Sequence, residues 1–254
     1  MNLLSPRQQA ILNRVVDAYI EAAQPIGSHF ITKVYTDLYH DSYSSATVRH
    51  EMGVLEEMGY LTHPHTSAGR IPTDLGYRYY VDHGLRTEDW ASDYFQGMTK
   101  DLQESSEIDT LAEKISRWMS EASQEVSLVF LSETGQGRRH FYLQGTSRIV
   151  EKPEFQDFKK VRMLLKAFEE KMKLMDWFEG KGHPGGLSVS IGRENEPEAF
   201  WDCAVVSTHY YAHGKKGGTL ALIGPRRMNY SRNVPLVERM GRLLGSVLDQ
   251  ADEG

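Results

Sequence analysis

The chain has 254 residues and a formal net charge of −6, with 40% hydrophobic and 25% charged residues, which is ordinary for a soluble globular protein. The acidic balance argues against a protein that coats nucleic acid without specificity. We find no apolar run that could span a bilayer or serve as a secretory signal, and the single cysteine, Cys203, excludes an intrachain disulfide. We therefore expect a cytoplasmic protein that does not associate with membranes.

The first part of the chain predicts an amphipathic helix over residues 5–23. Ser5 and Gln8 have the spacing of a capping box, and Pro6 stands at the first helical position. Apolar residues then recur at helical period: Ile11, Leu12, Val15, Val16, Tyr19 and Ile20. A second helix is expected after Gly27, where Ser28 could either cap the helix or contact a phosphate.

A third helix is expected from Ser44 or Ser45, either of which can cap it, to Gly59. A short strand over 60–62, a polar loop over 63–70, a possible return strand at 71–72 and a fourth helix from Thr73 follow. Three helices, a loop between two short strands and a trailing helix indicate a winged helix-turn-helix, which binds DNA.

The third helix would then be the one that enters the major groove. With Val48, Met52 and Leu55 facing the core, a helical wheel turns these residues outward or beside the outward face: Ala46, Thr47, Arg49, His50 and Gly53. Arg49 can bond guanine or a phosphate, and Ala46 and the Thr47 methyl group can touch thymine. Ser44, Ser45 and the free N–H groups of the first turn can hold a phosphate. The alternative is an ordinary serine-capped helix, and the elements around it favour the DNA-reading interpretation.

The polar loop offers five further candidates for DNA contact: His63, His65, Thr66, Ser67 and Arg70. They suit contact with the backbone or the minor groove, and the alternative is a solvated loop. A metal site at His63 and His65 is disfavoured because no cysteine or third histidine lies nearby in the sequence. We expect no metal and no cofactor.

Residues 86–125 are acidic, with 10 Asp/Glu against 4 Lys/Arg, and predict a helical segment between the two halves. We leave open whether it is a solvated linker or a dimer-forming helix. Beyond it, strands are expected over 126–131, 141–143, 187–191, 203–209 and 219–223, and helices over 157–178 and 236–248. The apolar face of the 157–178 helix would contain Phe158, Val161, Leu164, Leu165, Phe168, Met172 and Met175. Strands and helices without regular alternation indicate an α+β domain.

An enzyme is the main rival class. Cys203 and His209 could suggest thiol chemistry, but the apolar strand around Cys203 favours a buried structural cysteine. No phosphate loop, dinucleotide fingerprint or zinc-hydrolase motif is present, and the glycine-rich run 214–218 fits a tight hairpin turn better. We expect no catalytic site.

The segment SSATVRHEMGVLEEMGYLTHPHTSAGRIPTDLGYRYYVD (44–82) closely resembles the HrcA family of heat-inducible transcription repressors. Within it, HTSAGRIPTDLGYR (65–78) is the strongest match. PIGSHFI (25–31), LQGTSRIVEKPEFQDFKKVRMLL (143–165) and LIGPRRMNYSRNVPLVERM (222–240) resemble further parts of the family. The resemblance therefore involves both ends of the chain.

This resemblance implies a repressor of chaperone operons that binds an inverted-repeat operator, CIRCE, as a homodimer. It also implies that the chaperonin GroEL keeps the repressor active until heat diverts it, and that the C-terminal half is a GAF-like domain with an inserted dimerisation domain. This chain is much shorter than is usual for the family, because residues 131–141 stand where a long middle section is expected. His50 stands where the family commonly has asparagine, which bonds adenine in a bidentate way.

The predicted organisation is a winged helix-turn-helix over 1–85, a helical linker over 86–125 and a GAF-like regulatory and dimerisation domain over 126–254 that lacks most of the insertion. The alternative function is a ligand-sensing winged-helix regulator whose GAF-like domain binds a metabolite. A thermal-shift screen would separate the two, because a specific ligand that raises the melting temperature would favour the sensor.

Overall fold

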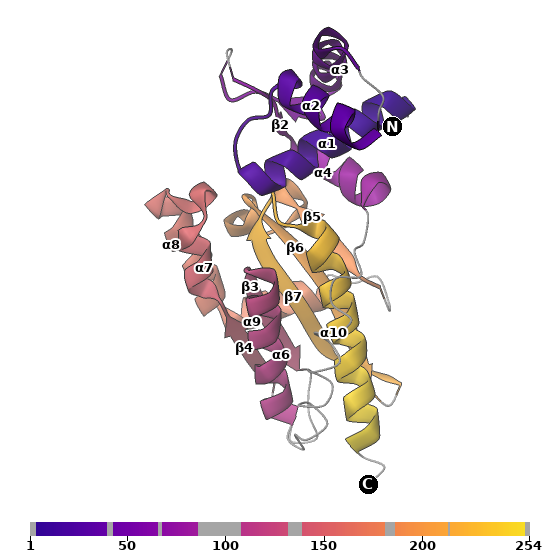
Figure 1. Cartoon of the computed structure of the whole chain (residues 1–254). Coiled ribbons are helices and arrows are strands. Elements are labelled where there is room, and N and C mark those ends of the chain that lie inside the picture. The colour runs from indigo at the N-terminus through magenta and orange to yellow at the C-terminus, as the bar shows by residue number, and fades with distance from the viewer. Residues whose placement is uncertain are drawn as a thin grey trace. The chain divides into compact units, whose positions relative to one another are not determined.

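The computed structural model describes residues 4–39, 43–65, 68–85, 108–131, 139–180, 186–212 and 214–251. The chain divides into two compact units, Met1–Arg86 and Thr87–Gly254 (Figure 1). Within the described ranges, no helix is both long and apolar enough to cross a membrane.

The first unit contains helices followed by a very small sheet. Its elements are α1 (Pro6–Ala22), α2 (Ser28–Tyr39), α3 (Ser45–Glu57), β1 (Leu61–Thr62), β2 (Ile71–Pro72), α4 (Asp74–Tyr79) and the π-helix η1 (Tyr80–Gly84). β1 and β2 are antiparallel. This is the order of helices and strands that the sequence pattern predicts.

Helix α1 organises the core of this unit. The capping box between Ser5 and Gln8 is present, as predicted. Four apolar side chains of α1 are fully buried: Ile11, Leu12, Val15 and Val16. The Tyr80 hydroxyl donates a hydrogen bond of 2.7 Å to Asp17 and so fixes η1 against α1. Helix α1 also packs against α3 and β2, so it connects the third helix with the small sheet.

The second unit is built on a five-stranded antiparallel sheet in the order β4-β3-β7-β6-β5. The strands are β3 (Val126–Leu131), β4 (His140–Gln144), β5 (Ser188–Ile191), β6 (Cys203–Ala212) and β7 (Lys215–Pro225). The helices are α6 (Ile108–Ser123), α7 (Thr146–Glu151), α8 (Phe158–Glu169), α9 (Lys171–Gly180) and α10 (Tyr230–Ala251). Short 3₁₀ turns are η2 (Pro153–Phe155), η3 (Gly192–Glu194) and η4 (Glu198–Phe200). A mixed α+β fold is confirmed.

The sheet is covered on both faces (Figure 1). Helices α6 and α10 pack together over β3, β4, β6 and β7 on one face. Side chains of α7, α8 and α9 form an apolar core with Phe130, Val205 and Ile223 on the other face. Every residue of β3 is buried, as expected for a central strand that packs on both sides.

The apolar side of helix α6 packs inside the second unit. Its apolar side chains Leu111, Ile115 and Met119 are at most 1% exposed, because α6 lies against β3 and α10. It is therefore part of the second unit, and this side of the helix is not free to contact a second chain. Residues 86–107 lie outside the described residues.

The single helix predicted over 157–178 is wrong in two respects. It is interrupted at Glu170, whose φ of −78° and ψ of 57° are not helical, so that α8 and α9 are separate helices. The predicted apolar face is also divided: Leu164 and Phe168 are buried, whereas Phe158 is 77% exposed and Leu165 is 38% exposed. The interruption divides the segment into two helices. Phe158 and Leu165 stay exposed for a different reason, because on a helical wheel they lie roughly 60–120° around α8 from the buried Leu164 and Phe168.

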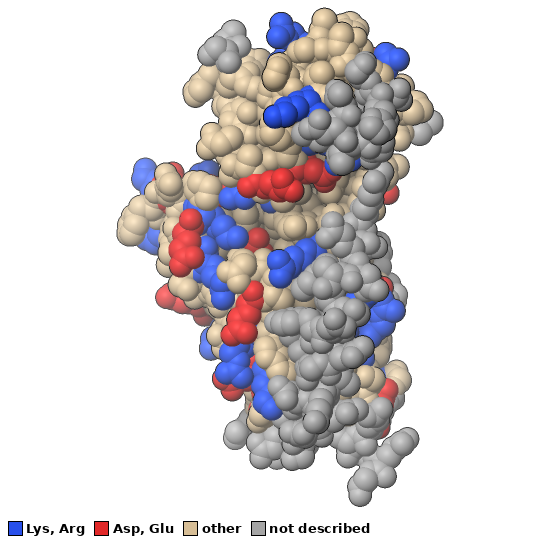
Figure 2. Space-filling model, viewed as in Figure 1, with Lys and Arg blue, Asp and Glu red and all other residues tan. Residues whose placement is uncertain are grey.

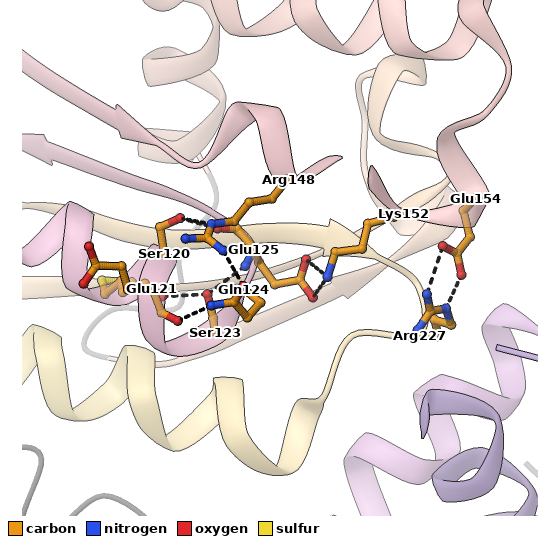
Figure 3. Close-up of polar contacts among 10 residues, drawn as sticks. Ser120, Glu121, Ser123, Gln124, Glu125, Arg148, Lys152, Glu154 and Arg227 are labelled. Atoms are coloured by element: carbon orange, nitrogen blue, oxygen red, sulfur yellow. Dashed lines mark hydrogen bonds and ion pairs between the residues drawn. The ribbon is translucent and has the colours of Figure 1, made fainter. Parts of the chain in front are cut away.

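A polar cluster lies where α6 leads into β3 (Figure 3). The Ser120 hydroxyl donates to the carbonyl oxygen of Glu125 at 2.8 Å. The Glu125 carboxylate is 4% exposed and lies 3.3 Å from the Lys152 ammonium group. Burial raises the pKa of Glu125 to about 7, because it outweighs the opposing effect of Lys152. Beside this pair, Arg227 binds both carboxylate oxygens of Glu154.

Candidate DNA interface

The start of α3 is fixed by hydroxyl groups from two helices. Ser44 is the N-cap, and its Oγ accepts a hydrogen bond from the backbone N–H of Thr47 at 3.1 Å. Ser45 is the first helical residue, and its Oγ lies 3.3 Å from that of Ser28. Ser28 is itself the first residue of α2, so Gly27 and not Ser28 takes the cap position there. The three serines therefore lie together at the N-terminal ends of α2 and α3.

The two sides of α3 have opposite environments. Val48, Met52 and Leu55 are at most 1% exposed, as predicted for the core side. On the opposite side, Ala46, Arg49 and His50 are exposed, and Thr47 and Gly53 are half-buried. A Cβ placed on Gly53 would meet nothing within 4 Å. The outward face of α3 is thus open along its first two turns.

Ion pairs within the first unit use most of its cations. Residues 1–85 contain six Lys/Arg and nine Asp/Glu. Four of the six cations pair with carboxylates of the same unit: Arg7 with Glu51, Arg14 with Asp17, Arg70 with Glu56 and Arg78 with Asp82. Lys33 and Arg49 have no hydrogen-bond or ion-pair partner among the residues that the structure describes, and both are exposed. These two are the cations available to an anionic ligand.

The β1–β2 loop is tied to α3 by one carboxylate. Glu56 of α3 contacts the His63 imidazole and accepts from Arg70 at 3.1 Å (Nε) and 3.0 Å (Nη2). Partial burial raises the pKa of Glu56, but His63 and Arg70 outweigh it and hold that pKa below its usual value. Backbone hydrogen bonds of 2.8 and 2.9 Å also join Arg70 to Ile26. The base of the loop is therefore rigidly attached to both α3 and the α1–α2 turn.

This geometry changes how two loop candidates are interpreted. Arg70 and His63 are held by Glu56, so their first role is to position the loop, and DNA contact by either remains a prediction. His65 is exposed. Thr66 and Ser67 lie outside the described residues, so their contact with DNA stays a prediction as well.

Sequence reasoning missed Glu51, Glu56 and Lys33. Glu51 accepts from the Gln8 side chain at 3.1 Å and pairs with Arg7, whose guanidinium also lies 5.2 Å from the centre of the Tyr43 ring. The available signal was the excess of acidic residues in a domain expected to bind DNA. The structure explains that excess in part, because Glu51 and Glu56 anchor α3 and its neighbours.

Cys203 and His209, the two residues that could have suggested thiol chemistry, both have structural surroundings. Cys203 is fully buried in β6, and burial raises the pKa of its thiol far above the ordinary value. His209 lies 2.9 Å from the Thr219 hydroxyl and 3.3 Å from the Lys216 ammonium group. Within the described residues, the chain thus combines a unit with an open helix face and a separate α+β unit.

Comparisons with known proteins give the family. Residues 85–234 match the family model described as "HrcA protein C terminal domain". The heat-inducible transcription repressor HrcA of Shouchella clausii is 30% identical in an alignment that covers 94% of this chain and 97% of the relative. The protein of the same name from Brevibacillus brevis is 28% identical over 97% and 98%. The chain belongs to the HrcA family of transcription repressors, which confirms the predicted resemblance and the choice of a repressor over an enzyme.

The alignment also measures how short this chain is. The alignment with the S. clausii protein is 339 residues long, whereas this chain has 254, so at least 85 aligned positions have no residue of this chain. Among solved structures, the crystal structure of a hypothetical protein at 2.2 Å resolution has a TM-score of 0.82 at 20% identity. It covers 98% of this chain and 100% of its own length, and supports the fold.

Proposed function

We propose that this heat-inducible repressor silences chaperone genes by binding an inverted-repeat operator as a dimer in the cytoplasm. In this proposal residues 1–85 form a winged helix-turn-helix, in which α3 is the reading helix and the β1–β2 loop is the wing. The observation that carries it is the outward face of α3, which is exposed and holds the unpaired cation Arg49, while the opposite face is buried.

Each candidate residue has a defined role in this arrangement. Arg49 and His50 project from the first two turns of α3, where base edges would be read. Ala46 and the Thr47 methyl group would touch thymine, and Gly53 would let the DNA approach the helix closely. Ser28, Ser44 and Ser45 would hold a phosphate at the helix ends. His63, His65, Thr66, Ser67 and Arg70 would form the wing, with Glu56 setting its position.

A gel shift on a duplex with an inverted-repeat operator tests the reading helix. Arg49→Ala and His50→Ala should each lower operator affinity by about 10-fold or more, since a base contact contributes roughly 1–3 kcal/mol. Arg117→Ala removes an exposed cation from α6 of the second unit and is the matched control. Wild-type affinity in both α3 variants would contradict the assignment.

Control by heat and by the chaperonin GroEL belongs to the same proposal, with the second unit as a GAF-like regulatory domain. Heating the protein alone should reduce operator binding, and chaperonin should restore it. Operator binding that is unchanged by heat, with or without chaperonin, would remove this part of the proposal.

The ligand-sensing alternative rests on a groove in the second unit. It has a volume of about 530 Å³ and lies between β6 and α10, with Thr208, Tyr211 and Arg242 among its lining residues. A metabolite that binds there should raise the melting temperature of the wild type but not of a variant in which the groove is filled, such as Ser246→Trp. A screen without such a ligand would favour the stability-controlled repressor.

A further inference from the structure

Helix α8 has an exposed strip that its own unit does not cover. Phe158, Arg162, Leu165 and Glu169 are spaced by four, three and four residues, which places all four within about 60° on a helical wheel. Phe158 is 77% exposed, Leu165 is 38% exposed, and the two charged residues are also exposed. In the described parts of the chain, neither Arg162 nor Glu169 has a hydrogen-bond or ion-pair partner. Phe158 and Arg162 belong to residue types that are enriched at protein interfaces.

The charges on α8 are arranged unevenly along its length. The strip itself carries one cation, Arg162, and one carboxylate, Glu169, at the last residue of the helix. The other exposed cations of α8, Lys159, Lys160 and Lys166, lie outside the strip on a helical wheel, and Lys160 pairs with Asp202. Figure 2 shows positive and negative side chains gathered over the α7–α8 region of the second unit. Because Arg162 and Glu169 carry opposite charges seven residues apart, the strip is complementary to itself when two copies run antiparallel.

We propose that two copies of the chain associate through this strip, with their α8 helices antiparallel about a twofold axis. When the axis passes near Leu165, Arg162 of each copy lies beside Glu169 of the other. With a rise of about 1.5 Å per residue, the two ion pairs lie about 5 Å on either side of the axis. The two Leu165 side chains meet at the axis, and Phe158 extends toward the α8–α9 corner of the second copy. Such a contact is isologous, as closed dimers require.

This proposal rests on the proposed function, in which the repressor is a dimer. It assigns the dimer interface of the shortened chain to α8. One helix strip buries less area than a standard stable interface, so the free dimer should be weak and dependent on concentration. An operator with two half-sites would then strengthen the pairing, because binding both raises the effective concentration of one copy for the other. Dimerisation and operator binding would therefore support each other.

A charge swap tests the proposed register. Sedimentation equilibrium of the full chain should show that Arg162→Glu and Glu169→Arg each raise the dimer dissociation constant at least 10-fold, because each creates two like-charge contacts. The double variant should return to within about threefold of the wild type. The proposal is overturned if the single variants associate like the wild type, if the double variant stays dissociated, or if the wild type is monomeric at all concentrations.

Two further measurements keep this proposal separate from DNA reading. Phe158→Ser should weaken association, whereas Val150→Ser, which removes a 50% exposed apolar side chain from α7 outside the strip, should not. In gel shifts with a single half-site, all α8 variants should bind like the wild type, and only the full operator should discriminate. Loss of half-site binding by α8 variants that keep wild-type circular dichroism would overturn the assignment to dimer contact. Failure of Arg49→Ala to weaken half-site binding would instead contradict the reading helix.

Discussion

Raising the pH from about 5.5 to about 7.5 should destabilise the second unit through one buried side chain, Glu125. This carboxyl is 4% exposed, close to Lys152, and packed so tightly that a Cβ on Gly224 would come within 2.4 Å of its Oε2 atom. The effect of burial on the pKa of Glu125 is larger than the opposing effect of Lys152. The pKa is therefore about 7 in the folded protein, whereas the ordinary value is 4.5. The unfolded chain therefore releases this proton at a lower pH than the folded chain does.

The sign and size follow from proton linkage. A carboxyl whose pKa is raised by folding contributes stability that is complete below pH 4.5 and is lost as the pH rises through the folded value of about 7. One pKa unit corresponds to about 1.4 kcal/mol, so the change between pH 5.5 and 7.5 should be about 2 kcal/mol. Above about pH 8 the loss should level off, since Glu125 is then ionised in both states.

Urea unfolding followed by tryptophan fluorescence measures this change in the correct part of the molecule. All four tryptophans, Trp90, Trp118, Trp177 and Trp201, belong to the second unit. Glu125→Gln keeps the shape of the side chain but cannot ionise, so it should lack the loss of about 2 kcal/mol. Subtracting its pH profile from that of the wild type also removes the contribution of histidines.

Glu121→Gln is the matched control, because Glu121 is exposed in the last turn of α6, four residues before Glu125. Its pH profile should follow the wild type. Parallel profiles for the wild type and Glu125→Gln would refute the reasoning, since they would mean that Lys152 keeps Glu125 ionised despite its burial.

Three further predictions concern the first unit and the sheet. Glu56→Gln should loosen the β1–β2 loop and weaken operator binding several-fold in gel shifts, with little change in the circular dichroism of the unit. Lys33→Ala should reduce the slope of log affinity against log salt by about 1 if Lys33 contacts one phosphate, whereas Arg117→Ala should not change it. Gly218→Ala should destabilise the second unit by about 2–4 kcal/mol in urea unfolding, because the added Cβ would come within 2.0 Å of the Phe130 carbonyl oxygen.

Periodicity and capping residues were enough to predict most helices and strands. Ser5, Gln8 and the apolar stripe placed α1 almost to the residue, and the run 126–131, apolar except for Ser127, gave β3 its bounds. These signals are local, so a single sequence contains them. The order of the strands in the sheet is set by contacts between distant segments and could not be predicted in the same way.

The errors and omissions share one physical cause. They depend on which distant segments of the chain pack together, and a local sequence pattern does not contain that information. The apolar spacing of 157–178 suits one continuous amphipathic helix, and nothing in it reveals that Glu170 interrupts the helix or that Phe158 stays exposed. The outward positions of α3 were correct because only the helical period decides them. The ties of Arg7 to Glu51 and of Arg70 to Glu56 join residues 44 and 14 positions apart, so they could not be predicted from spacing.

The internal pairing of cations in the first unit has a consequence for the search through a genome. Bulk DNA offers about 10⁶–10⁹ competing sites, and attraction to them grows with the number of phosphates that a protein neutralises. A unit whose arginines mostly form ion pairs with its own carboxylates should neutralise few phosphates. It should therefore dissociate quickly from these competing sites. If α3 is the reading helix, as proposed, a repressor present in few copies would remain available for its operators, and occupancy would depend on the fit of α3 to the bases more than on general attraction to the double helix.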